Sequence, residues 1–165
     1  MSPPTTVAPF RKILVATDFS RHSVEAVTTA AALSRQCDAP LTVLTVYETL
    51  VVPSVPEGEP VPPPRIMVAA YEHTAHLLEQ AVAQARAAGA VHVEGIILQG
   101  APFTEILACA RTGGHDLIVV GTHGRTGLRH FLLGSVAERV VRRAHCAVLA
   151  VRLPAGTVTT TEVPA

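Results

Sequence analysis

One segment, GTHGRTGLRHFLLGS at residues 121–135, combines residue types that suit the binding of a phosphate group. Gly121 and Gly124 allow a backbone to approach a ligand closely. Gly134 and Ser135 open a predicted helix, and the first amides of a helix point outward with a partial positive charge. Residues 121–145 also hold five arginines and one glutamate in a chain whose formal net charge is zero. The segment therefore predicts a phosphate cradle.

Each of these features also has a structural interpretation. Glycines are common in tight turns after strands, and Ser135 followed by Glu138 has the spacing of a capping box. Arg142 and Arg143 fall in the last turn of the predicted helix, where positive charge is favourable. Because all of the features converge on one place of the predicted fold, phosphate binding is the favoured interpretation.

The elements that must position this segment alternate between strands and helices. Apolar, β-branched runs predict strands at 12–17, 41–46, 91–98, 116–121 and 146–153. Helical patterns cover 20–37, 66–88, 102–112 and 135–144. Gly89 is a stop signal for the second helix, and Pro102 suits the first turn of the third. The alternation predicts a doubly wound, Rossmann-like α/β fold with helices on both faces of a five-stranded parallel sheet.

The ends of two predicted strands define where a ligand is expected. The runs at 12–17 and 116–121 are apolar without alternation, which is typical of central strands. Right-handed crossovers then place the reversal of strand order between the first and fourth strands. Ligands of open parallel sheets bind beside such a reversal, at the carboxyl ends of the strands. Those ends read Ala16-Thr17-Asp18 and Gly121-Thr122-His123-Gly124.

The 165 residues are predicted to form a single domain over 11–153. A flexible N-terminus at 1–10 and a disordered tail at 154–165 are expected on either side. Residues 48–65 hold six of the thirteen prolines and are expected to form neither helix nor strand. A lid over the site and a disordered linker are both open interpretations of that loop.

Composition excludes several classes of function. The chain has 13 basic and 13 acidic residues, so it lacks the basic excess of a nucleic-acid-binding protein. No apolar run is long enough to span a bilayer, and the first residues do not form a signal peptide. Cys37, Cys109 and Cys146 are odd in number and far apart, which fits a reducing cytoplasm better than a disulfide framework or a zinc site. We expect a cytoplasmic protein without a membrane or nucleic-acid partner.

The sequence resembles the universal stress protein (UspA-like) family, in its ATP-binding subclass. KILVATDFS near the start, the run from 116 to 152, and the spacing Gly121-x2-Gly124-x9-Gly134-Ser135 carry this resemblance over residues 11–152. The resemblance implies strand order 3-2-1-4-5 and a site that binds ATP with Mg²⁺ or Mn²⁺. It also implies a homodimer joined through the last strand, 146–153. That strand is long, apolar and expected at a sheet edge, where pairing with a second copy would cover it.

The resemblance also assigns roles to single residues, with the base, the sugar and the phosphates at successive parts of the site. Ala16 and Val46 are expected to line the adenine pocket, and Asp18, next to Thr17, faces the ribose and adenine. The ribose and α-phosphate are expected to contact Val120, Gly121, Thr122, His123, Gly124, Arg125 and Thr126. The outer phosphates, with a divalent ion between them, are expected at Gly134, Ser135 and Val136.

Other candidate residues carry weaker signals. His73 and His76 could share a helix face as metal ligands, but they have no third ligand nearby in sequence, so a solvated surface is favoured. His123 and His130 flank the phosphate loop as either phosphate donors or exposed side chains. Cys109 is expected to pack rather than to act as a nucleophile.

We expect a regulatory protein that binds ATP, with a slow ATPase or a nucleotidyl-transferring enzyme on the same site as the alternative. An efficient NTPase would normally carry the P-loop GxxxxGK[ST], which the sequence lacks. A receiver domain would need paired acids near the first strand, where only Asp18 stands. A dinucleotide oxidoreductase would need GxGxxG, which is also missing.

Overall fold

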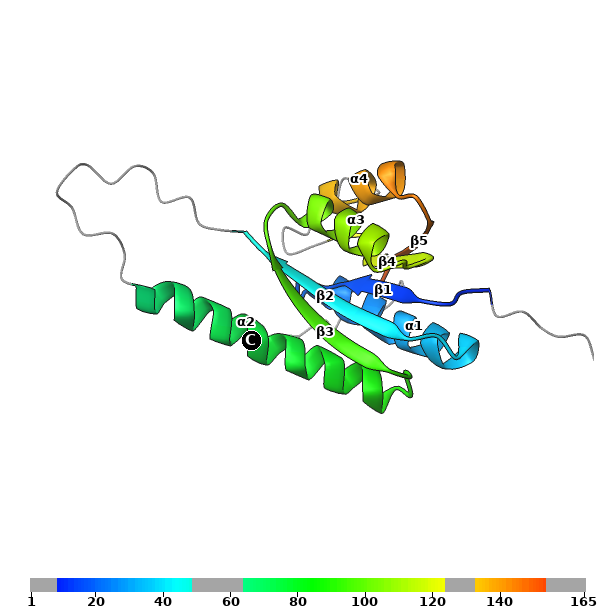
Figure 1. Cartoon of the computed structure of the whole chain (residues 1–165), viewed down its shortest axis with the longest axis horizontal. Coiled ribbons are helices and arrows are strands. Elements are labelled where there is room, and N and C mark those ends of the chain that lie inside the picture. Colours follow the sequence, from blue (N-terminus) through cyan, green and yellow to red (C-terminus); the bar gives the residue numbers. More distant parts are fainter. Residues whose placement is uncertain (1–8, 49–63, 124–132, 154–165) are drawn as a thin grey trace, which may run out of the picture.

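The computed structural model describes residues 9–48, 64–123 and 133–153, which form a three-layer α/β domain (Figure 1). Five parallel strands make one sheet in the order β3-β2-β1-β4-β5, so the predicted fold and strand order are confirmed. The strands are β1 (Ile13–Ala16), β2 (Leu41–Tyr47), β3 (Val93–Gln99), β4 (Leu117–Gly121) and β5 (Ala147–Val151). The helices are α1 (Arg21–Cys37), α2 (Pro64–Ala87), α3 (Pro102–Thr112) and α4 (Ser135–Arg143).

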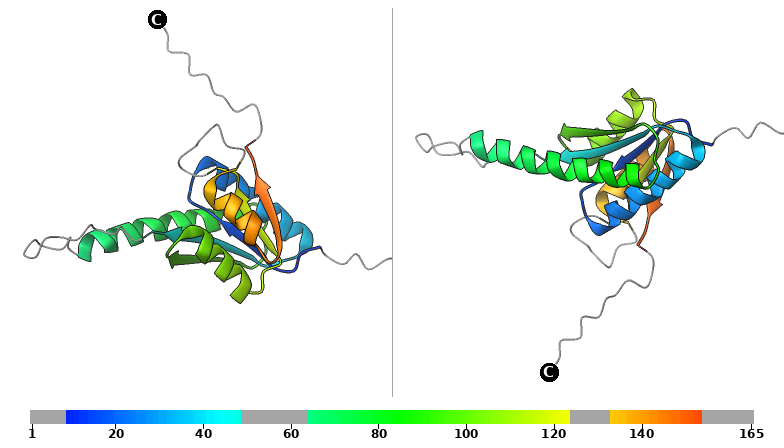
Figure 2. Two further views of the ribbon diagram at one scale, coloured as in Figure 1. Left: turned by 90° about the horizontal axis from the view of Figure 1, so that it is seen from above. Right: turned by 90° about the horizontal axis from the view of Figure 1, so that it is seen from below.

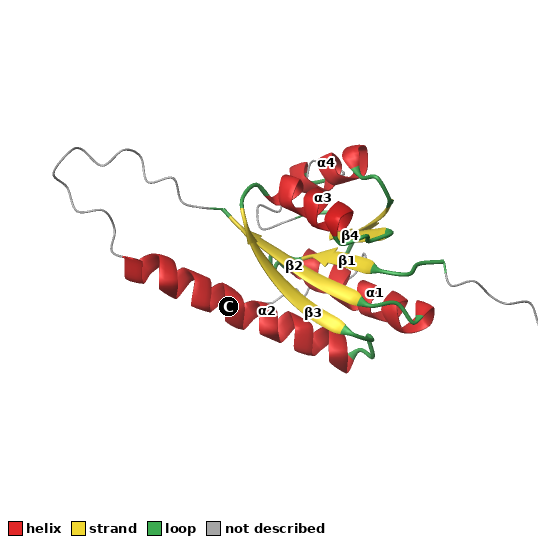
Figure 3. Ribbon diagram, in the orientation of Figure 1, coloured by secondary structure: helices red, strands yellow, loops and turns green. Residues whose placement is uncertain are grey.

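The helices cover the sheet in pairs, with α1 and α2 on one face and α3 and α4 on the other (Figures 2 and 3). Side chains of β1 alternate between the two apolar layers, since Ile13 and Val15 pack towards α1 while Leu14 packs towards α3 and α4. All three are fully buried, which explains why their strand reads as a continuous apolar run.

Local signals in the sequence account for the helix boundaries. Ser20 caps α1 by accepting a hydrogen bond from the Ser23 amide at 3.4 Å. After α2, Gly89 adopts φ +90°, and the Ala90 amide donates to the Ala85 carbonyl at 3.1 Å, which is a Schellman motif. Pro102 opens α3 as expected, because its missing amide hydrogen is not needed in a first turn.

The proline-rich stretch at 48–65 was expected to form no helix, but its last two residues belong to α2. Helix α2 begins at Pro64, because a proline is tolerated in the first turn of a helix. Residues 49–63, the N-terminal residues 1–8 and the tail 154–165 lie outside the described residues, so the lid interpretation and the disordered tail stay predictions. Phe10, assigned to the flexible N-terminus, packs partly buried against the core on the α1 side.

The segment that leads into β1 is joined to β4 through one carboxylate. Asp116 accepts hydrogen bonds from the backbone amides of Arg11 at 2.8 Å and Lys12 at 3.0 Å. These bonds align the starts of two central strands, and the register continues from Ile13 opposite Leu117. The carboxyl ends of β1 and β4 are therefore held side by side at the other end of the sheet. Among the described residues, no helix has both the length and the apolar character needed to cross a membrane.

Candidate functional site

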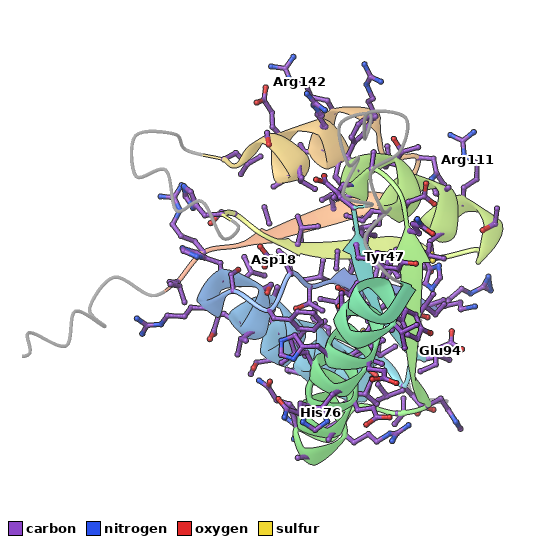
Figure 4. The ribbon with its side chains drawn as sticks, turned by 90° about the vertical axis from the view of Figure 1, so that its left-hand side faces the viewer. Asp18, Tyr47, His76, Glu94, Arg111 and Arg142 are labelled. Atoms are coloured by element: carbon purple, nitrogen blue, oxygen red, sulfur yellow. The ribbon has the colours of Figure 1, made fainter. Side chains whose placement is uncertain are left out.

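A cavity of about 290 Å³ lies at the carboxyl ends of β1, β2 and β4, where the strand order reverses. Figure 4 looks onto this end of the sheet, with Asp18 near its centre. Every predicted site residue that the structure describes lines the cavity: Ala16, Thr17, Asp18, Val46, Val120, Gly121, Thr122, His123, Gly134, Ser135 and Val136. The volume is close to the lower limit, roughly 300 Å³, of small-molecule sites. Gly124, Arg125 and Thr126 lie outside the described residues.

The turn between β1 and α1 is shaped by its own polar side chains. The Thr17 hydroxyl accepts from the Phe19 amide at 3.0 Å and donates to the Ser23 hydroxyl at 3.0 Å. The Asp18 carboxylate accepts from the Ser20 amide through Oδ1 at 3.0 Å. Phe19 has φ +64°, a conformation that costs a residue other than glycine about 1–2 kcal/mol. The buried hydroxyl of Thr17 therefore holds the turn, while Asp18, half-buried, borders the cavity.

Gly121 ends β4 for a reason that the sequence did not indicate. A Cβ atom at this position would lie 2.9 Å from the carbonyl carbon of His22 and 3.0 Å from its oxygen. The glycine was predicted to admit a ligand; it lines the cavity, but its lack of a side chain is required by the first turn of α1. Beyond it, the Thr122 amide donates to the Val151 carbonyl at 2.8 Å, which attaches the end of β4 to β5.

The start of α4 differs from the predicted capping box. Gly134 is the N-cap, with φ −69° and ψ 156°, so Ser135 is the first residue inside the helix and makes no capping hydrogen bond. Glu138 instead pairs with Arg142 at 3.0 Å on the exposed side of the helix. The Gly134 amide donates to the Thr122 carbonyl at 2.6 Å, which places the helix start beside the end of β4.

The first residues of α4 border the cavity and carry backbone amides that the helix itself does not use. The first donor with a partner inside the helix is the Glu138 amide, which bonds the Gly134 carbonyl at 2.9 Å. The amides of the three residues before it have no intrahelical acceptor. Ser135, Val136 and Ala137 all border the cavity. The site therefore offers a cluster of backbone donors at the positive end of a helix dipole, which suits a phosphate or carboxylate group.

The opposite part of the cavity is apolar. Ala16, Leu44 and Val46 come from the ends of β1 and β2, while Pro102 and Ile106 come from the first turns of α3. Sequence reasoning missed five lining residues, which are Ser23, Leu44, Pro102, Ile106 and Ala137. The position of Pro102 directly after β3 was a usable signal, because α3 starts at the same edge of the sheet. A flat apolar group fits here, while a charged group fits the α4 side.

Two imidazoles stand beside the cavity. The rings of His22 on α1 and His123 after β4 have centroids 5.1 Å apart and are tilted by 48°. Partial burial lowers the pKa of His22 below its ordinary value, and repulsion by His123 lowers it further, whereas Asp18 opposes both effects. His123 Nδ1 lies 3.1 Å from the buried Thr122 hydroxyl. The sequence left two interpretations of His123, a donor to phosphate or an exposed side chain. In the structure it is half-buried at the cavity wall.

The weaker candidates are not brought to this site. His73 and His76 are exposed on α2, and the described residues contain no cluster of three potential metal-ligating side chains. Burial raises the pKa of the Cys109 and Cys146 thiols, which keeps them protonated and makes them poor nucleophiles. His130 lies outside the described residues. The cavity at the strand ends is therefore the candidate site.

Fold and cavity together define a doubly wound α/β protein with a ligand-sized site at its switch point. The family model of the universal stress protein family matches residues 9–152. The chain belongs to this family, as its sequence motifs indicated. A relative from Methanocaldococcus jannaschii, Universal stress protein MJ0531, is 38% identical over 148 residues, which are 88% of this chain and 84% of that protein.

Two solved structures of similar proteins were determined with nucleotides. A universal stress protein in complex with cAMP is 29% identical, with a TM-score of 0.67, over 87% of this chain and 97% of that one. The universal stress protein from Archaeoglobus fulgidus in complex with dAMP is 26% identical, with a TM-score of 0.59, over 86% of this chain and 97% of that one. Both bound molecules named there are adenine nucleotides.

Proposed function

We propose that this chain is a regulatory protein that binds adenine nucleotides, with ATP as its ligand, in the cavity between the strand ends and α4. The observation that carries the proposal is the composition of the cavity lining, which has apolar side chains from β2 and α3 on one side of β1 and the first amides of α4 on the β4 side. The first amides of α4 accommodate phosphate, and the apolar residues of β1, β2 and α3 contact the base. Similar proteins solved with cAMP and dAMP support the choice of an adenine nucleotide.

The base is expected at the apolar end because the lining residues from β2 and α3 are all uncharged. Ala16, Val46 and Ile106 offer hydrocarbon surface to a planar ring, and Asp18, which also lines the cavity, follows β1, the strand between β2 and β4. A carboxylate in this position can accept hydrogen bonds from ribose hydroxyls. The described lining presents no side chain at the apolar end to recognise the 2-amino group of guanine, so ATP should bind more tightly than GTP.

A divalent ion, Mg²⁺ or Mn²⁺, is proposed to enter with the nucleotide. The donor set fits this route, because the described residues contain no group of three carboxylate, histidine or cysteine ligands that would hold an ion alone. Mg²⁺ keeps several waters and is bound largely by substrate phosphates. When bound, the ion would neutralise charge on the outer phosphates beside Ser135.

Calorimetric titration with ATP, GTP and AMP in the presence of Mg²⁺ tests this proposal. We expect saturable binding of ATP, with GTP weaker by roughly tenfold or more, which corresponds to about 1.4 kcal/mol. Chromatography of the mixture after overnight incubation measures ADP formation and decides between a binding protein and a slow ATPase. Equal affinity for ATP and GTP would contradict the assignment of the apolar end to adenine, and binding of neither would contradict the proposed function.

A further inference from the structure

The two imidazoles at the edge of the cavity come from separate elements that are held together tightly. His22 belongs to the first turn of α1, and His123 follows the end of β4. Their rings are 5.1 Å apart, and the two elements approach closely at Gly121, where any side chain would meet the backbone of His22 within about 3 Å. His123 lines the cavity directly, whereas His22 contacts the cavity through His123.

The hydroxyl of Thr122 can serve either protonation state of His123. It lies 3.1 Å from Nδ1 and is buried, with 3% of its residue surface exposed. A hydroxyl group donates to the lone pair of a neutral imidazole, and after rotation it accepts from the N–H of an imidazolium. The contact therefore remains satisfied when a proton is added. Protonation of His123 does not leave a buried polar atom without a partner at this contact.

Burial and nearby charges favour the neutral form of His22 in the protein without ligand. Three groups face His22, namely His123 after β4, Asp18 in the β1–α1 turn and Arg21 on the same helix. Burial, His123 and Arg21 lower the pKa of His22, and Asp18 alone raises it. Two imidazolium groups at this separation also repel each other. A phosphate group at the start of α4 would reverse this balance, because its negative charge favours the protonated rings.

We propose that His22 is a positioning residue that acts through His123, and that the pair takes up a proton when a nucleotide phosphate binds. This inference rests on the proposed function, since it concerns the same site. The site would then also respond to pH, because acidification protonates the pair before the nucleotide binds and so tightens binding. Histidine is suited to this role, because its side chain changes charge between about pH 5 and 8.

The expected pH dependence follows from linkage. Ligand binding raises the affinity of the pair for protons, so protons raise the affinity of the pair for ligand by the same factor. Affinity is then lowest at high pH, rises as the pH falls towards the pKa of His22 in the unliganded protein, and levels off below it. The slope reaches at most about tenfold per pH unit for one full proton. We expect the dissociation constant for Mg²⁺–ATP to fall by about fivefold between pH 7.5 and 6.0.

Proton uptake is measured by calorimetry at pH 6.5 in two buffers that differ in ionisation enthalpy. The ligands are Mg²⁺–ATP, AMP and adenosine, and the proteins are the wild type, His22→Gln and the control His76→Gln, which removes an exposed histidine on α2. The wild type and His76→Gln should take up protons with ATP and AMP but not with adenosine. His22→Gln should bind ATP with at most half of this uptake and less than a twofold pH dependence. The ligand's own titration cancels in the difference between proteins.

A second measurement does not require the variant to bind. The Cε1–H resonance of His22, assigned by its loss in His22→Gln, is titrated in the wild type with and without saturating AMP. Its midpoint should move to higher pH with AMP. An unchanged midpoint, or equal proton uptake in the wild type and His22→Gln, would overturn the inference and leave nucleotide binding intact. If no nucleotide binds at any pH, the proposed function itself fails.

Discussion

The Nε2 atom of His115 lies 3.0 Å from the hydroxyl oxygen of Thr42, at the end of the sheet opposite to the cavity. The Thr42 hydroxyl donates to Glu94 at 2.8 Å, so it accepts from an Nε2–H of His115. Only 4% of His115 is exposed, and its Nδ1 is buried without a hydrogen-bond partner among the described residues. Burial in this environment favours the neutral form of the imidazole.

This arrangement predicts that acid destabilises the fold through His115. Burial lowers the pKa of His115 below its ordinary value of 6.5, and the charge of Lys12 adds to the effect. The unfolded chain then binds a proton more readily than the folded one, so the contribution is complete above pH 6.5 and is lost as the pH falls through the lower, folded-state pKa. Urea denaturation between pH 8 and 5 should show the wild type losing more stability than His115→Gln.

His145→Gln provides the control, because His145 is exposed. Its free energy of unfolding should follow that of the wild type across the whole pH range. Parallel curves for the wild type and His115→Gln would show that His115 does not titrate differently in the folded and unfolded chains.

Ser135→Pro tests the backbone donors of α4 without removing a structural group. Proline is favoured at the first position of a helix, and Gly134 before it has the extended φ and ψ that proline requires. The variant lacks one amide hydrogen at the phosphate end, so ATP affinity should fall by roughly 1.5–3 kcal/mol, the value of a hydrogen bond to a charged group. Ser135→Ala retains the amide and should bind more tightly than Ser135→Pro in the same titration. Equal binding by the two variants is the result that excludes this amide from the site.

Asp18→Ala should weaken ATP binding by about 1–3 kcal/mol, because a carboxylate bordering the cavity would no longer accept from the ribose. Part of any loss could come from the turn, since Asp18 also accepts from the Ser20 amide. Ser20→Ala removes the helix cap and leaves Asp18 in place, so it measures the cost of loosening the turn. Titration of both variants should rank Asp18→Ala as the weaker binder.

Gly121→Ala should destabilise the fold by roughly 1–3 kcal/mol, because its methyl group would meet the backbone of His22. The comparison variant is Gly114→Asn, at a position with φ +66° and no atom within 4 Å of an added Cβ. Asparagine tolerates this conformation, so the cost should be smaller. Urea denaturation measures the free energy of unfolding of both variants, and so compares the steric requirement at Gly121 with the conformational requirement at Gly114. A smaller loss of stability for Gly121→Ala than for Gly114→Asn would contradict the proposed contact.

The position of β5 at the edge of the sheet predicts a homodimer, as the family resemblance implied. Ala147 is exposed and Val148 half-buried along this strand. Val148→Lys should give a monomer in sedimentation velocity experiments at micromolar concentration, whereas the wild type should sediment as a dimer. Val68→Lys, an identical change on the exposed side of α2, should remain dimeric. A lysine at Val151 is not informative, because Val151 is 9% exposed and belongs to the core. Monomeric wild-type protein would rule out the edge pairing.

The sequence was informative wherever a local pattern has one structural meaning. Apolar runs located the strands, and the residues after β1 and β4 identified the cavity, because carboxyl ends of parallel strands must meet at one edge of the sheet. The contact of Gly121 with His22 could not be predicted, since it depends on how closely α1 packs against β4. The spacing of Ser135 and Glu138 suggested a capping box, but Gly134 had already provided the extended residue that an N-cap needs.

The hydrogen bond from the Thr122 amide to the Val151 carbonyl affects when the site can form during synthesis. On the ribosome the N-terminal parts of a chain become available to fold first. The lining residues of the apolar end all lie before residue 107, but α4 and β5, the strand that holds Thr122, emerge after them. A growing chain thus has the base-contacting surface well before its anion-binding helix. Ligand binding can begin only once β5 has emerged, so a nucleotide would stabilise chains that extend through β5 and leave chains that end before it unprotected.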